Sequence, residues 1–241
     1  MKHVIITGAN GNIGYHLANR LLDNRHSLYL FYHEKSDRIE RLADHPLVET
    51  IQVDLTDTTT IDKHIKRLFQ RVHPDVLIHT AAVRSFDFKP LCESSPEIWE
   101  KVITTNILST YSILRACIPF LRNAKPGRVI IFGSDVSRMG LKNGSAYAAS
   151  KAALANICRT VAKEEPDVYI NTLSPGPIMI DDSHFDDDYR SFRQNYYAEP
   201  KKNIPLKRVA VPEDVIGLSL FLISDENSYI SGEEFFITGG K

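Results

Sequence analysis

The sequence HVIITGANGNIGYHLANRLL, residues 3 to 22, decides the fold that we predict for this chain. Its first five residues, His3 to Thr7, form an apolar and β-branched run that indicates a buried strand. Glycines at positions 8, 11 and 14 then mark a tight turn, and the apolar periodicity that follows them predicts a helix. Glycines let a backbone approach an anion closely, and a helix N-terminus offers that anion free N–H groups. A strand, a glycine-rich turn and a helix in this order favour a dinucleotide-binding turn over a glycine-rich surface loop.

We expect the turn to hold the pyrophosphate of the dinucleotide. The residues predicted to bind it are Gly8, Asn10, Gly11, Asn12, Ile13 and Gly14. Gly14 falls inside the predicted helix, where a glycine costs about 1 kcal/mol relative to alanine. Close packing around Gly14 is therefore expected.

Strand-like runs alternate with helical patterns along the whole chain. The predicted strands are His3 to Thr7, Leu28 to Tyr32, Val48 to Val53, Val76 to His79, Val129 to Phe132, Tyr169 to Leu173 and Glu234 to Thr238. This alternation predicts an α/β fold of the Rossmann-like, doubly wound kind: a parallel sheet of about seven strands with helices on both faces. With no repeat or linker-like stretch in 241 residues, we expect one domain over residues 1–241.

Composition narrows the classes of function. Hydrophobic residues make up 43% of the chain, charged residues 24%, and the formal net charge is −1. No basic stripe or long apolar run is present, so we expect neither a nucleic-acid nor a membrane partner. The N-terminal sequence lacks the pattern of a secretory signal. The three cysteines are far apart in sequence, and we expect them to be reduced thiols that act as small, buried hydrophobic residues. We therefore predict a cytoplasmic protein, and the scattered histidines predict no metal site.

The residues after the second strand bear on the choice of cofactor. In this kind of fold an acidic residue there favours NAD, whereas basic residues accept the 2′-phosphate of NADP. The strand ends without a carboxylate, and His33, Lys35 and Ser36 follow it, with Arg38 close by. We therefore favour NADP(H). NAD(H) stays open because Glu34 could reach a ribose hydroxyl.

Further residues follow the third and fourth strands. Asp54, with Leu55 after it, could accept a hydrogen bond from the adenine amino group. Helix capping is the alternative, although Thr56 and Asp57 are nearer to the next helix. After the fourth strand, the small residues Ala81 and Ala82 leave room for a ribose.

A helix is predicted from about Ser95 to Leu121, with Asn106 in its interior. Asparagine is a mediocre helix former, so a buried Asn106 needs a polar task. Its neighbours Ile103, Ile107 and Leu108 favour burial over exposure on the outer face.

A second stretch, Arg128 to Ala155, carries the residues with the clearest chemistry. Its apolar start predicts a buried strand that ends before Ser134, and its alanine-rich end predicts a helix. Tyr147 and Lys151 are four residues apart, so they share one helix face. A fixed ammonium favours the phenolate and lowers a tyrosine pKa from about 10. These residues predict a proton-transfer site, and an amphipathic surface with a snorkelling lysine is the alternative.

Taken together, these residues resemble the short-chain dehydrogenase/reductase family, and the resemblance covers essentially the whole chain. The matching motifs are the glycine turn, Asp54, Ala81-Ala82, Asn106, Ser134, Tyr147-x-x-x-Lys151, Pro175-Gly176, Ser231-Gly232-Glu233 and Gly239-Gly240. Length and C-terminal pattern are similar to the compact branch, which includes 3-oxoacyl-carrier-protein reductases and carbonyl reductases.

The resemblance implies a role for each residue of the site. Tyr147 is implied to be the general acid and base, and Ser134 to orient the substrate oxygen. Lys151 is implied to bind the nicotinamide ribose and to lower the pKa of the tyrosine, and Asn106 to help hold a water of the proton relay. Residues Pro175, Gly176 and Ile178 are expected to contact the cofactor.

Some positions depart from the compact branch. Asn12 stands where a glycine is usual, the run His79-Thr80-Ala81-Ala82 replaces Asn-Asn-Ala-Gly, and Ile180 replaces a threonine near the carboxamide. The first two departures are similar to the extended branch, which modifies sugar nucleotides, although the chain is too short for that branch's substrate domain.

Residues at about 180–203 form a charged and aromatic insertion that is expected to act as a substrate-binding lid. Its aromatic residues could line an apolar pocket or pack the lid on the body, and they are Phe185, Tyr189, Phe192, Tyr196 and Tyr197.

The sequence thus predicts hydride transfer between NADP(H) and a small-molecule carbonyl or alcohol substrate. Two alternatives stay open: an oxidoreductase acting on a sugar or sugar nucleotide, and a non-catalytic NADP(H)-binding sensor. The family resemblance also implies a homo-oligomer, a tetramer or a dimer.

Overall fold

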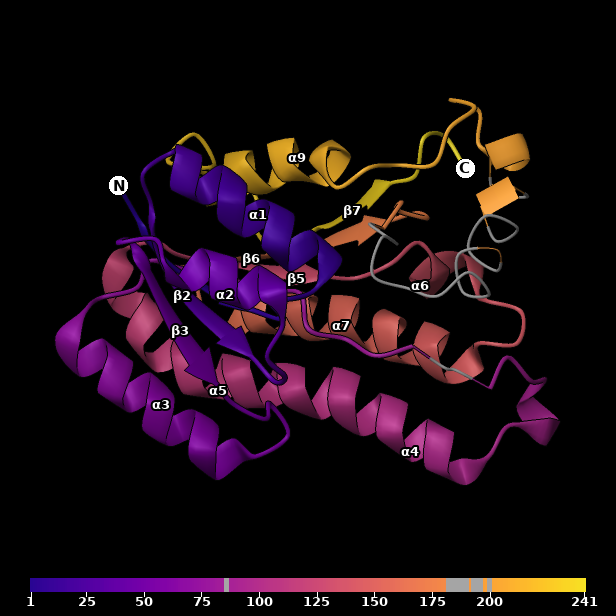
Figure 1. The fold of residues 1–241 in the computed structure, drawn as a ribbon, viewed down its shortest axis with the longest axis horizontal. Helices are drawn as coiled ribbons and strands as arrows, with labels where there is room; N and C mark the ends of the chain where they lie inside the picture. The colour runs from indigo at the N-terminus through magenta and orange to yellow at the C-terminus, as the bar shows by residue number, and fades with distance from the viewer. Residues whose placement is uncertain (85–86, 181–190, 192–196, 199–200) are drawn as a thin grey trace.

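The computed structural model of this protein describes residues 1–84, 87–180, 191, 197–198 and 201–241. Within them, seven strands form a parallel sheet in the order β3-β2-β1-β4-β5-β6-β7 (Figure 1). The strands are β1 (His3–Thr7), β2 (Ser27–Tyr32), β3 (Val48–Gln52), β4 (Val76–His79), β5 (Gly127–Phe132), β6 (Val168–Pro175) and β7 (Glu234–Ile237). The seven predicted strands are confirmed, with ends that differ by at most two residues.

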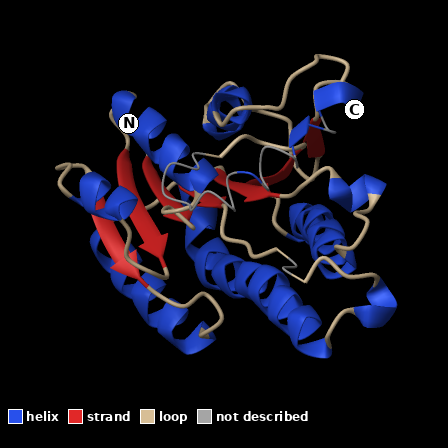
Figure 2. Ribbon diagram, turned by 45° about the vertical axis from the view of Figure 1, so that its right-hand side comes forward, coloured by secondary structure: helices blue, strands red, loops and turns tan. Residues whose placement is uncertain are grey.

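Helices cover both faces of the sheet (Figures 1 and 2). One layer consists of α1 (Asn12–Asp23), α2 (Asp37–Ala43) and α9 (Glu213–Ile223). The opposite layer consists of α3 (Thr58–Arg71), α4 (Pro96–Ile103), α5 (Ser109–Leu121) and α7 (Ser145–Glu164). The short α6 (Val136–Met139) lies between β5 and α7 and contacts α7.

Two hydrophobic cores explain why the strands read as continuous apolar runs. Successive side chains of a strand point to opposite faces, so Ile5 packs into the core under α3, α5 and α7. Val4 and Ile6 instead pack into the core under α1, α2 and α9. A strand buried on both faces has no polar side, which is the expected pattern for a parallel sheet.

The strand order places the candidate site. The chain runs outward from β1 through β2 to β3, then returns to place β4 on the other side of β1. The crevice at the carboxyl ends of β1 and β4, where the order reverses, is the usual ligand-binding position of such sheets.

The helix predicted from Ser95 to Leu121 is not regular. The structure divides it into α4, a π-helical turn (Thr104–Leu108) and α5. Hydroxyl groups one turn later bind the carbonyl oxygens of this wide turn: Ser109 binds Thr105, Thr110 binds Asn106 and Ser112 binds Leu108. Such back-bonding by Ser and Thr competes with regular helix bonds and bends helices.

The structure corrects one expectation about the cysteines. Cys117 and Cys158 are buried, and burial raises the pKa of both thiols. Cys92, in the short 3-10 helix Leu91–Glu93, is exposed, because this helix buries none of its residues. Among the described residues, no helix is long and apolar enough to cross a membrane, and no group of His, Cys, Asp and Glu could hold a metal ion.

Candidate active site

The glycine turn is packed so tightly that side chains are excluded. Gly8 has a φ of +69°, and a Cβ atom there would lie 2.7 Å from the backbone nitrogen of Ala81. A Cβ at Gly14 would lie 2.4 Å from the carbonyl oxygen of Gly8. The close packing predicted at Gly14 is confirmed, and its partner is the turn itself. The turns after β1 and β4 therefore meet at backbone distance.

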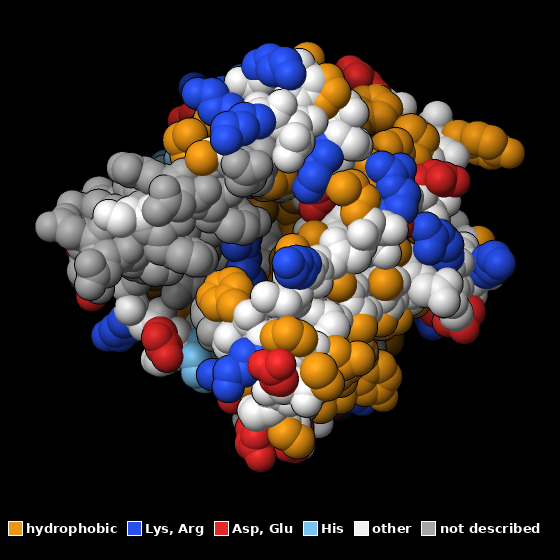
Figure 3. Space-filling model, turned by 90° about the vertical axis from the view of Figure 1, so that its right-hand side faces the viewer, with side chains coloured by type: hydrophobic (Ala, Val, Ile, Leu, Met, Phe, Trp, Pro, Cys, Tyr) orange, Lys and Arg blue, Asp and Glu red, His pale blue; other side chains and the backbone are white. Residues whose placement is uncertain are grey.

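A cleft of about 740 Å³ opens beside this turn, at the carboxyl ends of β1, β2 and β4. We call it the main cleft. Eight of the residues predicted to bind cofactor line it, namely Gly8, Asn10, Gly11, His33, Asp54, Leu55, Ala81 and Ala82. The molecular face seen in Figure 3, which corresponds to the right-hand side of Figure 1, is visibly hollowed near its centre.

The main cleft fits a dinucleotide. Helix α1 begins after Gly11, and no side chain caps its first turn. Its N-terminal N–H groups and positive dipole therefore face the glycine turn without a competing side chain, as an anion site requires.

The residues after β2 divide into those that face the main cleft and those that do not. His33 and Glu34 line it, and their carbonyl oxygens accept hydrogen bonds from Gln52 Nε2 at 3.0 Å and Asn10 Nδ2 at 3.1 Å. Lys35 and Ser36 are not among its lining residues. The Arg38 guanidinium lies over the ring of Tyr15, 5.3 Å from its centroid.

Asp54 lines the main cleft, and its carboxylate also binds the turn that follows it. Its Oδ1 accepts hydrogen bonds from the backbone N–H and the hydroxyl of Thr56, at 2.8 and 2.7 Å. These bonds hold the pKa of Asp54 below its usual value. The helix cap of α3 is Asp57, as the sequence suggested, since its carboxylate accepts from the backbone N–H groups of Thr59 and Thr60.

Ser134 follows the end of β5 at Phe132, and Tyr147 and Lys151 lie in the first two turns of α7, as predicted. Lys151 is buried, and its Nζ donates a hydrogen bond of 2.7 Å to the carbonyl oxygen of Phe132. The same Nζ lies 5.6 Å from the ring centroid of Tyr147. The surface alternative, with a snorkelling lysine, is therefore wrong for Lys151.

Burial changes the charge behaviour of Lys151. Desolvation, followed by repulsion from the Arg84 guanidinium, lowers the pKa of Lys151 to about 7. A ligand that accepts a hydrogen bond from the ammonium would favour its charged form. Ribose hydroxyls are acceptors of this kind.

Asn106 is completely buried, as its apolar neighbours predicted. Its Nδ2 donates to the carbonyl oxygen of Val83 and to Ser150 Oγ, both at 2.9 Å, and its Oδ1 accepts from the Val83 N–H at 2.8 Å. Ser150 Oγ in turn donates to the carbonyl oxygen of Tyr147 at 2.8 Å. Asn106 therefore joins the turn after β4 to the first turns of α7.

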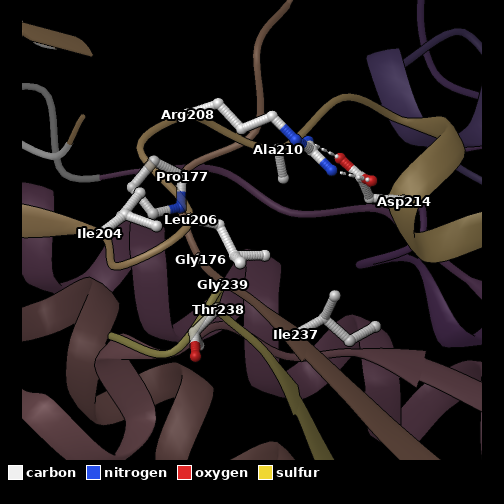
Figure 4. A pocket seen from close by; sticks show the side chains of 10 residues that line it. All are labelled: Gly176, Pro177, Ile204, Leu206, Arg208, Ala210, Asp214, Ile237, Thr238 and Gly239. Atoms are coloured by element: carbon white, nitrogen blue, oxygen red, sulfur yellow. Dashed lines mark hydrogen bonds and ion pairs between the residues drawn. The ribbon is translucent and has the colours of Figure 1, made fainter.

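Other predicted cofactor residues lie outside the lining of the main cleft. They are Asn12, Ile13, Gly14, Lys35, Ser36, Tyr147, Lys151, Pro175, Gly176 and Ile178. Asn12 Nδ2 donates to the carbonyl oxygen of Met179 at 3.0 Å, so α1 is tied to the segment that follows β6. Gly176 lines a separate cavity of about 120 Å³. Arg208 and Asp214 also line it, and both terminal nitrogens of the guanidinium donate hydrogen bonds to the carboxylate (Figure 4).

The structure also shows contacts that the sequence did not indicate. Buried Asp135 follows Ser134, and its Oδ2 lies 3.0 Å from Lys241 Nζ, more than a hundred residues away. His79 is buried with both ring nitrogens near threonine hydroxyls. For His79, the signal was a polar residue at the end of the apolar strand β4; for Asp135, no sequence signal pointed to Lys241.

The predicted lid lies mostly outside the described residues, and so do the aromatic residues Phe185, Tyr189, Phe192 and Tyr196. Tyr197 is described. Its hydroxyl donates to the carbonyl oxygen of Ile178 and accepts from the N–H of Ile180, both at 3.0 Å. This residue therefore holds the chain that leaves β6.

Comparison with known proteins agrees with this geometry. A family model described as enoyl-(acyl carrier protein) reductase matches residues 8–241. The chain belongs to the short-chain dehydrogenase/reductase family. The 3-oxoacyl-[acyl-carrier-protein] reductase MabA of Mycobacterium tuberculosis is 29% identical, over 99% of this chain and 92% of its own length. The corresponding reductase FabG of Chlamydia pneumoniae is 28% identical, over 99% of this chain and 96% of its own length.

Solved structures of short-chain dehydrogenases/reductases share the fold. ElxO, solved with NADP bound, is 25% identical with a TM-score of 0.88 and covers 100% of this chain and 98% of its own. A ligand-free aldohexose dehydrogenase from Thermoplasma acidophilum is 23% identical with a TM-score of 0.87, over 99% and 93% of the two chains. The chain is thus an oxidoreductase of a family that binds NAD(P).

Proposed function

We propose that this short-chain dehydrogenase/reductase is a carbonyl reductase or alcohol dehydrogenase that uses Tyr147 as its general acid and base. The observation that carries the proposal is the burial of Lys151 Nζ beside the Tyr147 ring, at the end of β5 where Ser134 follows. Burying an ammonium is costly, and its position beside a tyrosine suits proton transfer.

The residues divide the work as follows. Tyr147 gives its phenolic proton to the carbonyl oxygen during reduction and takes a proton back during oxidation. Ser134 donates a hydrogen bond that orients the substrate oxygen. Lys151 as an ammonium favours the phenolate of Tyr147 and binds the ribose, and Asn106 helps to hold a water of the proton relay. When bound, the nicotinamide supplies or accepts the hydride.

We further propose NADP(H) as the cofactor of this chain. Two observations support it: β2 ends at Tyr32 without a carboxylate, and ElxO was solved with NADP bound. The glycine turn would hold the pyrophosphate, and Asp54 and Leu55 would flank the adenine. Because Glu34 lines the main cleft and its carboxylate would suit a ribose hydroxyl, NAD(H) is the comparison cofactor in every assay.

The substrate classes to compare follow from the relatives and from the glycine turn. The relatives named 3-oxoacyl-[acyl-carrier-protein] reductases make 3-oxoacyl thioesters the first class. The spacing of Gly8, Gly11 and Gly14, similar to the extended branch, makes sugars and sugar nucleotides the second class. The protein is further proposed to act as a homo-oligomer in the cytoplasm.

The test is oxidation of NADPH and NADH, followed by absorbance, against ketones, 3-oxoacyl thioesters, keto-sugars and sugar nucleotides. The Tyr147→Phe variant should lose at least about a hundredfold in turnover, because a positioned acid contributes that much. It should still bind NADPH, as measured by the change in nicotinamide fluorescence.

Tyr229→Phe is the matched control, because this tyrosine is 97% exposed and lies outside the main cleft. Near-full turnover of Tyr147→Phe would overturn the acid–base assignment. Turnover that requires a nucleotide diphosphate on the substrate would favour the sugar-nucleotide alternative. Saturable NADPH binding without turnover of any compound would favour a non-catalytic sensor.

A further inference from the structure

His79 occupies an unusual position at the end of β4. It is only 1% exposed, yet both of its ring nitrogens have polar partners. Its Nδ1 lies 2.6 Å from Thr7 Oγ1, and its Nε2 lies 3.0 Å from Thr110 Oγ1. The imidazole therefore bridges the end of β1, directly before the glycine turn, and helix α5.

The directions of these hydrogen bonds follow from Thr110. Its hydroxyl donates to the carbonyl oxygen of Asn106 at 2.7 Å, and a hydroxyl has one proton to give. Thr110 Oγ1 must therefore accept from His79, which makes Nε2 the protonated nitrogen. Nδ1 of a neutral ring is then an acceptor, so Thr7 donates to it. Every donor in this chain of bonds thus meets an acceptor.

The chain of bonds ends at the turn that presents Asn106. The carbonyl oxygen held by Thr110 lies within the π-helical turn Thr104–Leu108. The side chain of the same Asn106 binds Val83 and Ser150, and Ser150 binds the carbonyl oxygen of Tyr147. Two sets of hydrogen bonds, joined through the covalent structure of Asn106, thus link Thr7, before the glycine turn, to the first turn of α7.

We propose that His79, as the neutral Nε2–H tautomer, is a positioning residue: together with Thr7 and Thr110 it fixes the wide turn at Asn106 and thereby the placement of Tyr147 relative to the glycine turn. The effect of this placement on catalysis rests on the function proposed above. The tautomer of His79 and the fixed turn are independent of that function. Rigid placement matters because a displacement of about 1 Å at reacting groups costs about a hundredfold in rate.

The surroundings of His79 keep the ring neutral. Burial, together with repulsion from the Lys151 ammonium, lowers the pKa of His79 to about 3. A protonated ring would also need Thr7 as an acceptor and would reverse the first hydrogen bond. His79 is therefore suited to hold one hydrogen-bond pattern across the working pH range.

The first measurement is nitrogen NMR of the ring of His79 in the free protein, labelled with ¹⁵N-histidine, with His79→Gln identifying the signal. We expect a protonated Nε2 and an unprotonated Nδ1 without titration between pH 5 and 8. A ring that titrates near its ordinary pKa, or carries its proton on Nδ1, overturns the proposal whatever the enzyme's substrate is.

The second measurement uses Thr110→Val, which removes the hydroxyl at nearly constant shape, with Thr110→Ser as the conservative rescue. In the valine variant we expect faster hydrogen exchange of the backbone amides in residues 104–110, and wild-type exchange in the serine variant. A thermal unfolding transition shows whether each of the three proteins is folded. Equal exchange in all three folded proteins overturns the proposal.

The third measurement is the steady-state kinetics of the two Thr110 variants with the substrate that the wild type turns over fastest in the NADPH assay. We expect kcat to fall about tenfold or more in Thr110→Val, with the KM for NADPH within about twofold, and to recover in Thr110→Ser. An unchanged kcat in Thr110→Val overturns the positioning role. Should no substrate be turned over, the proposed function fails, while the NMR and exchange results still decide the tautomer and the turn.

Discussion

Lys151 Nζ lies 2.7 Å from the carbonyl oxygen of Phe132 in the buried interior between α7 and β5. This bond gives the buried Lys151 ammonium a polar partner at the end of β5, where the last four side chains, Val129 to Phe132, are apolar. The neutral carbonyl satisfies one of its three donors. The remaining donors are suited to a ligand that brings hydroxyl groups.

The buried Lys151 predicts a pH dependence of stability. Burial lowers its pKa to about 7, whereas in the unfolded chain the value is about 10.4. Between these values the unfolded chain binds more protons, so stability rises with pH, by up to about 1.4 kcal/mol per pH unit for this group. The free energy of unfolding of the wild type should therefore rise relative to Lys151→Met between pH 7 and 10, as measured in urea. Parallel curves for the two proteins would contradict the lowered pKa of buried Lys151.

Gly14→Ala should be strongly destabilising. The new Cβ would lie 2.4 Å from the carbonyl oxygen of Gly8, which is backbone and cannot turn aside. We expect a loss of about 2 kcal/mol or more in unfolding free energy, together with weaker NADPH binding. Gly217→Ala is the control, because nothing lies within 4 Å of a Cβ there and the residue is inside α9. This control should gain about 0.5 to 1 kcal/mol. Similar effects at both positions would contradict the tight turn.

Lys241→Met should lower stability through Asp135. The carboxylate of Asp135 is 5% exposed and lies 3.0 Å from Lys241 Nζ, so the substitution leaves a buried charge without its cation. We expect a loss of about 1 to 3 kcal/mol in unfolding free energy at pH 7. Arg71→Met is the matched control, because its pair with Glu49 is exposed on both sides and should contribute less than about 1 kcal/mol. A loss at Arg71 as large as that at Lys241 would refute the distinction.

Glu34→Gln should shift the choice of cofactor toward NADPH. Glu34 lines the main cleft beside His33, where its carboxylate would repel a 2′-phosphate and would suit a free ribose hydroxyl. Removing the charge should raise the ratio of NADPH affinity to NADH affinity by about tenfold, measured by fluorescence titration at constant ionic strength. Glu49→Gln, on the edge strand β3 and outside the main cleft, should leave the ratio unchanged. An unchanged ratio in Glu34→Gln would place that carboxylate away from the ribose.

Local patterns were sufficient to predict the strands and several site residues. The alternation of apolar runs and helical periods located all seven strands of the described sheet. An apolar run reflects a strand that is buried on both faces, and a helical period reflects a helix that is buried on one face. The four-residue spacing of Tyr147 and Lys151 placed them on one helix face. The burial of Asn106 followed from its apolar neighbours.

Other features depend on more than the apolar pattern of the neighbouring residues. Cys92 is exposed in the 3-10 helix Leu91–Glu93, and hydroxyl groups one turn later bind the carbonyl oxygens of the π-helical turn at Asn106. Which residues after β2 face the main cleft depends on where the backbone turns, so Glu34 lines it and Lys35 does not.

The sequence by itself determined the parallel α/β fold, the glycine turn and the presence of Ser134, Tyr147 and Lys151, because periodicity and steric demands act between near neighbours. Only the tertiary structure decided that His79 joins Thr7 to Thr110 and that Asp135 meets Lys241. The physical reason is that a buried polar group must find its partner wherever the fold brings one within hydrogen-bonding distance, and that distance is independent of separation along the chain.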